Sequence, residues 1–270
     1  MKKKVIGILR WGFIIFIAML VAIIIKIFII EVYKIPSSSM EPTLLTGDYI
    51  VIQKLSYGAR LLRMKKLLKE KKQDYIRVNG FGEIEKNDVI VFNFPNYESF
   101  KDENPNIFGN FDMVKRCYGM PGDSVLVKNI RMKNENLFEQ KPDLFPQDST
   151  IKWTVDNFGP VYVPKKGATI QLNRKNVILY GRLMIFEELT IKINDSIVLR
   201  NNKPIHSYTF RENYYFMKGD NFYWSIDSRY LGFVPECNII GKAIIVVCSS
   251  NQDTKWYNSF RWKRILRIIK

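Results

Sequence analysis

Three consecutive serines stand in the segment IPSSSMEPTLLTGDYIVI, residues 35–52, where a hydroxyl-rich turn precedes an alternating strand pattern. A serine hydroxyl becomes an effective nucleophile only when a neighbouring group removes its proton. The only histidine in the chain, His206, stands between Ile205 and Ser207, without a recognisable active-site context. The sequence therefore favours a serine nucleophile whose base is not histidine.

A candidate base is Lys115, in the segment MVKRCYGMPGDSV at the end of a predicted strand. An unperturbed lysine has a pKa near 10.4, so only about one molecule in 2,500 is neutral at pH 7. Burial among apolar side chains destabilises the ammonium and lowers this pKa. The hypothesis of a Ser/Lys dyad therefore requires a buried Lys115. The alternative is that Lys115 and Arg116 form an ordinary basic pair on the surface before a turn.

One apolar stretch precedes the serine turn and could hold it near a membrane. Residues 11–30 would span about 30 Å as a helix, the thickness of a hydrocarbon core. Lys26 lies about one turn from the far end, where its side chain can extend to the interface. Residues 1–10 carry four basic side chains, whereas the flank after Ile30 is less basic. The positive-inside rule therefore places residues 1–10 in the cytoplasm and everything after Ile30 outside.

A cleaved signal peptide is the competing interpretation of this stretch, because basic residues followed by an apolar core describe one as well. Its only small-x-small site is Ser37-Ser38-Ser39. Cleavage there would remove the serine proposed as the nucleophile.

The chain after the anchor is dominated by strand patterns. The segments GDYIVI (47–52), NDVIVF (87–92) and GDSVLV (122–127) each place a turn with an aspartate before β-favouring residues, so we predict successive strands of one β core. Further strands are predicted at 161–164, 168–172, 197–201, 208–210, 213–219 and 241–248, and a helix is predicted at 174–188. The fold class is therefore mainly β: an N-terminal transmembrane helix and an extracytoplasmic β-rich core with an inserted second β or mixed region.

This pattern divides the chain into consecutive parts. They are a cytoplasmic N-terminus (1–10), a transmembrane helix (11–30), the first part of the β core (31–127, with a basic insertion at about 59–79), an inserted middle region (128–210), the last part of the core (211–250) and a basic amphipathic tail (251–270).

The net charge of +16, from 42 basic and 26 acidic residues, is compatible with nucleic acid or with an anionic lipid surface. The anchor favours membrane lipids, and no nucleic-acid partner is predicted. Residues 59–73 could form an amphipathic helix on the membrane or a solvated insertion. Residues 256–270 interleave aromatic, aliphatic and basic side chains, so we predict a short amphipathic helix in the lipid headgroups.

The three cysteines, Cys117, Cys237 and Cys248, form no CxxC pair and have no set of histidines beside them. A zinc site is therefore not expected. We predict free thiols, with a Cys237–Cys248 disulfide as the alternative, and neither a metal nor a cofactor.

Three blocks of sequence resemble, in the same order, the motifs of type I signal peptidases, also called leader peptidases. The blocks are PSSSMEPTLLTGD (36–48), KRCYGMPGDSV (115–125) and KGDNFYWSIDSRYLGFVPE (218–236). The resemblance implies a membrane serine protease with Ser39 as the nucleophile and Lys115 as the general base. It covers less than a quarter of the chain and leaves residues 128–210 without a motif.

The resemblance also implies supporting roles. The Ser37 hydroxyl and the Ser39 N–H would face the developing oxyanion, and Ser225 would orient the base lysine. Two ion pairs are implied, Asp227 with Arg229 and Asp220 with Arg116. The residues implied in substrate binding are Ile35, Met40, Leu44 and Val114, which line shallow apolar pockets, and Pro36, which fixes an extended approach to the serine turn.

A protein of this kind removes signal peptides from secretory preproteins after small residues in an Ala-x-Ala pattern. It would cross the inner or plasma membrane once, with its catalytic domain outside. The chain departs from the family pattern at Ser38, where glycine is common, and at 222–224, where Phe, Tyr and Trp replace polar residues.

Two other classes remain as alternatives. The self-cleaving repressors also use a Ser/Lys dyad on a β fold, but they are soluble proteins that bind DNA. A catalytically silent, membrane-anchored β-domain binding module is the other alternative.

Overall fold

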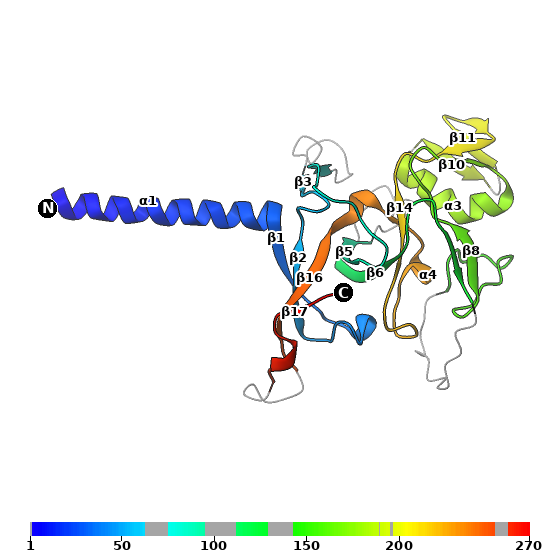
Figure 1. The fold of residues 1–270 in the computed structure, drawn as a ribbon. Helices are drawn as coiled ribbons and strands as arrows, with labels where there is room; N and C mark the ends of the chain where they lie inside the picture. The colour runs from blue at the N-terminus through cyan, green and yellow to red at the C-terminus, as the bar shows by residue number, and fades with distance from the viewer. Residues whose placement is uncertain are drawn as a thin grey trace.

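A long N-terminal helix projects from a β-rich body in the computed structural model (Figure 1). The structure describes residues 2–62, 75–94, 112–128, 143–188, 190–194, 197–251 and 259–270. Helix α1 spans Lys2–Ile24 and continues as a π-helical turn, η1, at Ile25–Ile29. The stretch Leu9–Ile29 has a mean hydropathy of 3.0, and none of it is buried against the body. This helix matches the predicted anchor in extent and has the length and apolar surface needed to cross a bilayer.

One curled antiparallel sheet forms the part of the body nearest the helix. Its strand order is β1-β2-β16-β5-β6-β14-β15, with β17 paired to β16. The strands are β1 (Ile30–Lys34), β2 (Asp48–Gln53), β5 (Val89–Asn93), β6 (Asp112–Gly119), β14 (Tyr214–Lys218), β15 (Val234–Pro235), β16 (Ile239–Ser249) and β17 (Arg267–Ile268).

Strand β1 follows the helix without a linker and pairs with β2 from Ile30↔Gln53 to Lys34↔Tyr49. The serine-rich segment is therefore the connection between two paired strands. Strand β2 alternates buried and partly exposed positions, with Ile50 and Ile52 fully buried, as expected for a strand with one face on the core. This arrangement holds the serine turn at the end of β1 away from the helix.

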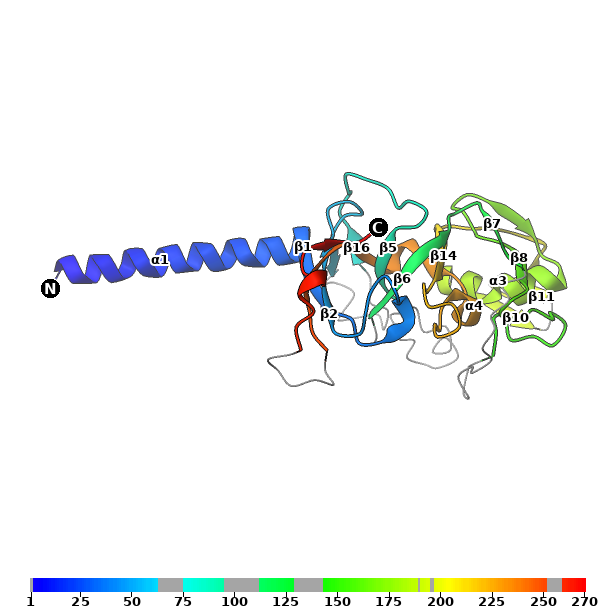
Figure 2. The same ribbon diagram turned by 60° about the horizontal axis from the view of Figure 1, so that its bottom comes forward.

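The second region lies at the end of the body farthest from α1 (Figures 1 and 2). It has its own apolar core, built on helix α3 (Arg174–Glu187), which matches the predicted helix and has Asn173 as its N-cap. Its strands are β7 (Ser124–Val127), β8 (Phe158–Tyr162), β9 (Thr169–Gln171), β10 (Ile191–Asn194), β11 (Ile197–Arg200), β12 (Lys203–Ile205) and β13 (Ser207–Thr209).

One strand prediction was right in position and wrong in pairing. Strand β7 pairs with β8, not with the strands of the large sheet. Val125 and Val127 pack into the same core as α3, so the chain enters the second region directly after the turn at Pro121 and Gly122. The predicted boundary after residue 127 falls at the end of β7.

The basic segment at 59–73 begins as a strand and not as a helix. Strand β3 (Arg60–Leu62) pairs with β4 (Tyr75–Arg77). The rest of that predicted helix or insertion, residues 63–74, lies outside the described residues. Beyond β14, short helical turns connect the strands, namely α4 (Ser228–Leu231) and η4 (Glu236–Asn238).

The prediction of an amphipathic helix in the tail was wrong for the described residues 259–270. A single 3-10 turn, η6 (Trp262–Arg264), leads to β17 on the edge of β16. The physical reason is a buried ion pair: the Arg264 guanidinium donates to both carboxylate oxygens of Asp48, which draws the tail onto the sheet. Phe260, Trp262, Leu266 and Ile268 remain exposed. None of the three cysteines forms a disulfide, and Cys117 is buried.

Candidate active site

The turn that carries Ser39 is held from below by apolar side chains. Ser39 lies in a 3-10 turn, η2 (Ser38–Met40), and is half-buried. Ile35, Met40 and Leu44 are 2%, 1% and 0% exposed and pack in one core cluster. The Ile35 N–H donates to the Asp48 carbonyl at 2.8 Å, which closes the β1–β2 connection. Burial on both sides of Ser39 fixes the backbone while its hydroxyl stays accessible.

Lys115 lies in the middle of β6, and its ammonium nitrogen is 2.6 Å from the Ser39 hydroxyl oxygen. Strand β6 runs between β5 and β14, and Lys115 pairs with Ile90 across the β5 ladder. The side chain is only 4% exposed. Tertiary structure therefore joins two residues that are 76 positions apart in the sequence.

Burial lowers the pKa of Lys115 to about 8, since a buried ammonium loses its hydration. Asp227 and Asp220 partly oppose this shift, and Arg229 adds to it. A lysine with that pKa is neutral in about one molecule in ten at pH 7, against about one in 2,500 for an unperturbed one. Burial therefore makes the neutral amine of Lys115 far more abundant at pH 7 than that of an exposed lysine.

The hydroxyl group predicted to face the oxyanion, that of Ser37, lies beside Ser39. The Ser37 hydroxyl oxygen is 3.4 Å from the Ser39 hydroxyl oxygen, and Ser37 is exposed. Pro36 is also exposed. A carbonyl that approaches Ser39 would thus meet an accessible hydroxyl donor on the same turn, as stabilisation of an oxyanion requires.

Asn221 connects the loop after β14 to the turn that carries Ser39 by two hydrogen bonds. Its backbone N–H donates to the Ser39 carbonyl at 3.1 Å, and its side-chain amide donates to the Ser38 carbonyl at 3.1 Å. No role was assigned to Asn221 from the sequence, although it belongs to the GDN triplet of the third block. The only sequence feature that could have indicated a role for Asn221 was its place in that block. Spacing along the chain cannot show that it contacts the backbone of Ser38 and Ser39.

Gly219 brings this loop into direct contact with Ser39. A Cβ atom at Gly219 would lie 2.1 Å from the Ser225 hydroxyl oxygen and 2.6 Å from the Ser39 carbonyl oxygen. Both distances are below the 3.0 Å that a real Cβ atom keeps from its neighbours, so only glycine fits there. Ser225 is 2% exposed, and its hydroxyl has no hydrogen-bond partner among the described residues. The structure thus places Ser225 close to the turn without a hydrogen bond to Lys115.

The implied ion pair of Asp227 and Arg229 is present and fully buried. The Arg229 guanidinium donates to both oxygens of Asp227, at 2.9 and 2.8 Å, and both side chains are 0% exposed. Asp227 also accepts the Gly219 N–H at 3.0 Å. Phe222 covers the pair, with its ring 4.1 Å from the guanidinium carbon of Arg229. The aromatic substitution at position 222 therefore supplies a cation–π contact.

Arg116 and Asp220 form the second implied pair, a two-point contact at 2.7 and 2.6 Å. Such fork-shaped pairs fix geometry as well as charge. Arg116 also donates to the Thr43 hydroxyl at 3.3 Å and to the Lys270 carbonyl at 3.0 Å. Arg116 therefore joins β6, which carries Lys115, to the segment after Ser39 and to the tail.

The residues implied in substrate binding are divided between core and surface. Ile35, Met40 and Leu44 are almost fully buried, and Val114 is half-buried against their cluster. Pro36 alone is exposed. Among these residues, Pro36 and Val114 present the surface that a bound peptide could touch directly.

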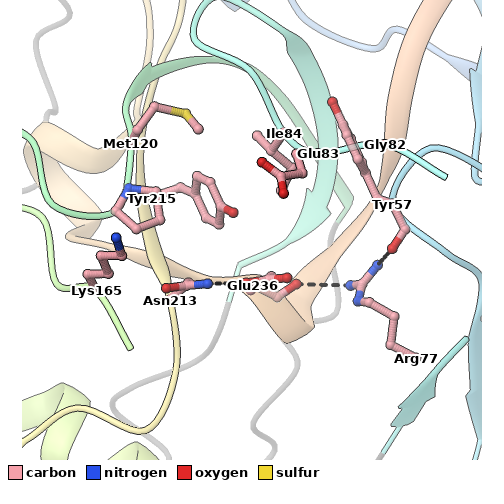
Figure 3. A pocket seen from close by; sticks show the side chains of 11 residues that line it. Tyr57, Arg77, Gly82, Glu83, Ile84, Met120, Lys165, Asn213, Tyr215 and Glu236 are labelled. Atoms are coloured by element: carbon pink, nitrogen blue, oxygen red, sulfur yellow. Dashed lines mark hydrogen bonds between the residues drawn. The ribbon is translucent and has the colours of Figure 1, made fainter. Parts of the chain in front are cut away.

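A separate cavity of about 410 Å³ lies away from the dyad, between β14 and the loop before β5 (Figure 3). It is lined by polar and apolar side chains, with Glu83, Tyr215 and Glu236 around its centre. None of the predicted site residues lines it. Among the described residues, no group of three or more His, Cys, Asp or Glu side chains is placed to hold a metal ion.

A serine hydroxyl in contact with a buried lysine, on a β-rich domain behind an apolar helix, is an arrangement suited to serine-dependent hydrolysis near a membrane. Comparison with known proteins agrees with this class. The model of a family described as "Signal peptidase, peptidase S26" matches residues 8–248.

Curated relatives match nearly the whole chain. Signal peptidase I of Buchnera aphidicola subsp. Schizaphis graminum is 31% identical over 268 residues, which cover 92% of this chain and 78% of that protein. Signal peptidase I of Pseudomonas aeruginosa is 29% identical over 262 residues, which cover 91% and 74%. The chain therefore belongs to the signal peptidase family, peptidase S26, and is a protease that removes signal peptides.

Proposed function

We propose that this chain is a membrane-anchored endopeptidase that cleaves signal peptides with Ser39 as the nucleophile and Lys115 as the general base. The observation that carries the proposal is the contact of 2.6 Å between the Lys115 amine and the Ser39 hydroxyl, made by a lysine that is 4% exposed. A neutral amine at that distance is within reach of the proton it must accept.

The proposed reaction has two steps. Lys115 takes the Ser39 proton as the hydroxyl oxygen attacks the carbonyl carbon, and the Ser37 hydroxyl and Ser39 N–H stabilise the oxyanion. The protonated Lys115 returns its proton to the leaving amine as the peptide bond breaks. Water then hydrolyses the acyl-enzyme, with Lys115 again as the base.

The proposed substrates are secretory preproteins with small residues, in an Ala-x-Ala pattern, before the scissile bond. Pro36 and Val114 offer a shallow surface above a filled core, which leaves little space for a large side chain. The anchor supports a location in the cell membrane, with residues 1–10 in the cytoplasm and the β-rich body outside. Membrane lipids would contact the exposed side chains of α1.

The test is cleavage of a detergent-solubilised preprotein with Ala-x-Ala before its mature start, followed by mapping of the new N-terminus. Wild type should cut after the second alanine, and Ser39→Ala and Lys115→Ala should each lose at least about 10³-fold in kcat. Ser207→Ala and Lys86→Ala, at exposed positions, serve as matched controls. A folded wild type that cuts no preprotein would instead support a silent binding module.

A further inference from the structure

Two exposed apolar side chains flank the buried Ser225 in the loop between β14 and α4. Trp224 and Ile226 are each 42% exposed, whereas Ser225 and Asp227 are each 2% exposed. This alternation is typical of an extended segment, in which successive side chains point to opposite sides. The side of the segment that carries Ser225 and Asp227 is therefore packed into the body, and the side that carries Trp224 and Ile226 faces solvent.

The same segment is held close to the nucleophile by backbone contacts. The Trp224 N–H donates to the Asn221 carbonyl at 3.1 Å, and the Asn221 N–H donates to the Ser39 carbonyl at 3.1 Å. Ser225 and the Ser39 carbonyl both lie against Gly219. Trp224 is thus connected through Asn221 to the turn that carries Ser39, and its side chain is exposed.

The position of this loop indicates which part of a substrate would meet it. Of the predicted pocket residues, Ile35, Met40 and Leu44 belong to one core cluster with β2, and Val114 packs against it. The loop approaches Ser39 from the other direction, because Phe222 packs against the core of the second region. If the residues before the scissile bond lie over the first cluster, the residues after the bond would lie on the side of Ser39 where this loop is.

We infer that Trp224 and Ile226 contact the first two residues after the scissile bond and favour large apolar side chains there. This inference rests on the proposed function. A tryptophan offers a large, rigid contact surface, and contacts of this kind typically change affinity by about tenfold or more.

The experiment measures kcat/KM for two peptides that share Ala-x-Ala and differ after the bond, with Leu-Leu in one and Gly-Gly in the other. Full-length enzyme in detergent is used throughout. Wild type should prefer the Leu-Leu peptide by about tenfold. Trp224→Ala should remove that preference by lowering cleavage of the Leu-Leu peptide, while the rate for the Gly-Gly peptide stays within about twofold. Trp224→Phe should restore most of the preference.

Trp262→Ala is the matched control, because Trp262 is 74% exposed in η6 and should leave the preference unchanged. An equal loss on both peptides in Trp224→Ala would overturn the inference and indicate a structural role or a contact with the detergent or membrane. Wild type that cleaves both peptides equally would overturn it and leave the proposed function intact. Failure to cleave either peptide would overturn both.

Discussion

The burial of Lys115 lowers the stability of the fold but favours the neutral amine that the proposed reaction requires. Its pKa is lowered to about 8, chiefly by burial. A lysine whose pKa is lower when folded than when unfolded destabilises the fold below about pH 8, and this cost disappears as the pH rises past the unfolded value near 10.5. The chain therefore retains a destabilising group whose burial favours the neutral amine that the proposed reaction needs.

This pKa predicts how activity depends on pH. As Lys115 loses its proton, kcat/KM should rise nearly tenfold per unit up to about pH 7, rise more slowly between pH 7 and pH 8, and level off above an apparent pKa near 8. The measurement is cleavage of an uncharged peptide across that range, with unfolding monitored at each pH. A rise that continued to pH 10 without a plateau would show that Lys115 is not desolvated.

At the scale of elements, the C-terminal tail supports the segment that carries Ser39 through hydrogen bonds. Arg264 is 9% exposed and donates to Asp48, which is fully buried, and to the Thr43 carbonyl at 2.9 Å. Asp48 in turn accepts the Leu45 N–H at 2.9 Å. Burial alone would raise the pKa of Asp48, but hydrogen bonds, first those from Arg264 and Ser249, lower it overall. Its contribution to stability is therefore present at neutral pH and lost in acid.

Removing the Arg264 side chain should leave a buried carboxylate without its partner. We expect Arg264→Leu to lower the free energy of unfolding by about 3–5 kcal/mol, and to lower kcat because the turn that carries Ser39 loosens. Denaturant unfolding in detergent measures the first effect, and cleavage of the Ala-x-Ala preprotein measures the second. Arg267→Leu, at an exposed position of β17, is the control. Equal stability of the two variants would contradict this supporting role.

At the scale of the whole molecule, a continuous run of secondary structure joins the anchor to the site. Helix α1 continues into η1, and β1 follows directly and pairs with β2. Lys54 adds a bond of 2.9 Å to the Lys26 carbonyl and an ion pair with Glu31 at 2.7 Å. The site is therefore held at a defined distance from the point where the chain would leave the membrane.

Deletion of residues 2–28 should leave peptide cleavage nearly unchanged but impair cleavage of substrates in a membrane. The α1 side chains described from Leu9 onward make no buried contact with the body, so the truncated protein should fold and cleave a short soluble peptide within a few-fold of the wild-type rate. Cleavage of a preprotein embedded in vesicles should fall by about 10²-fold or more, because the two proteins no longer share a surface. A comparable loss on the soluble peptide would show that the helix also supports the site.

The sequence by itself determined the elements whose signals are local. Apolar length defined the anchor, turn residues followed by β-branched residues defined β2, β5 and β7, and helical periodicity defined α3. Local residues suggested a serine nucleophile and a lysine base, and the resemblance of two short blocks to family motifs then assigned these roles to Ser39 and Lys115.

Only the tertiary structure decided which of these elements meet. The contact of Ser39 with Lys115, the role of Asn221 and the burial that lowers the pKa of Lys115 all depend on strands brought together from distant parts of the chain. The same is true of the two errors. The tail has a helical amphipathic pattern but becomes an edge strand because Asp48 binds Arg264, and β7 leaves the large sheet because its valines fill the core of the second region. Local pattern fixes what a segment can form, whereas long-range packing and charge pairing fix what it contacts.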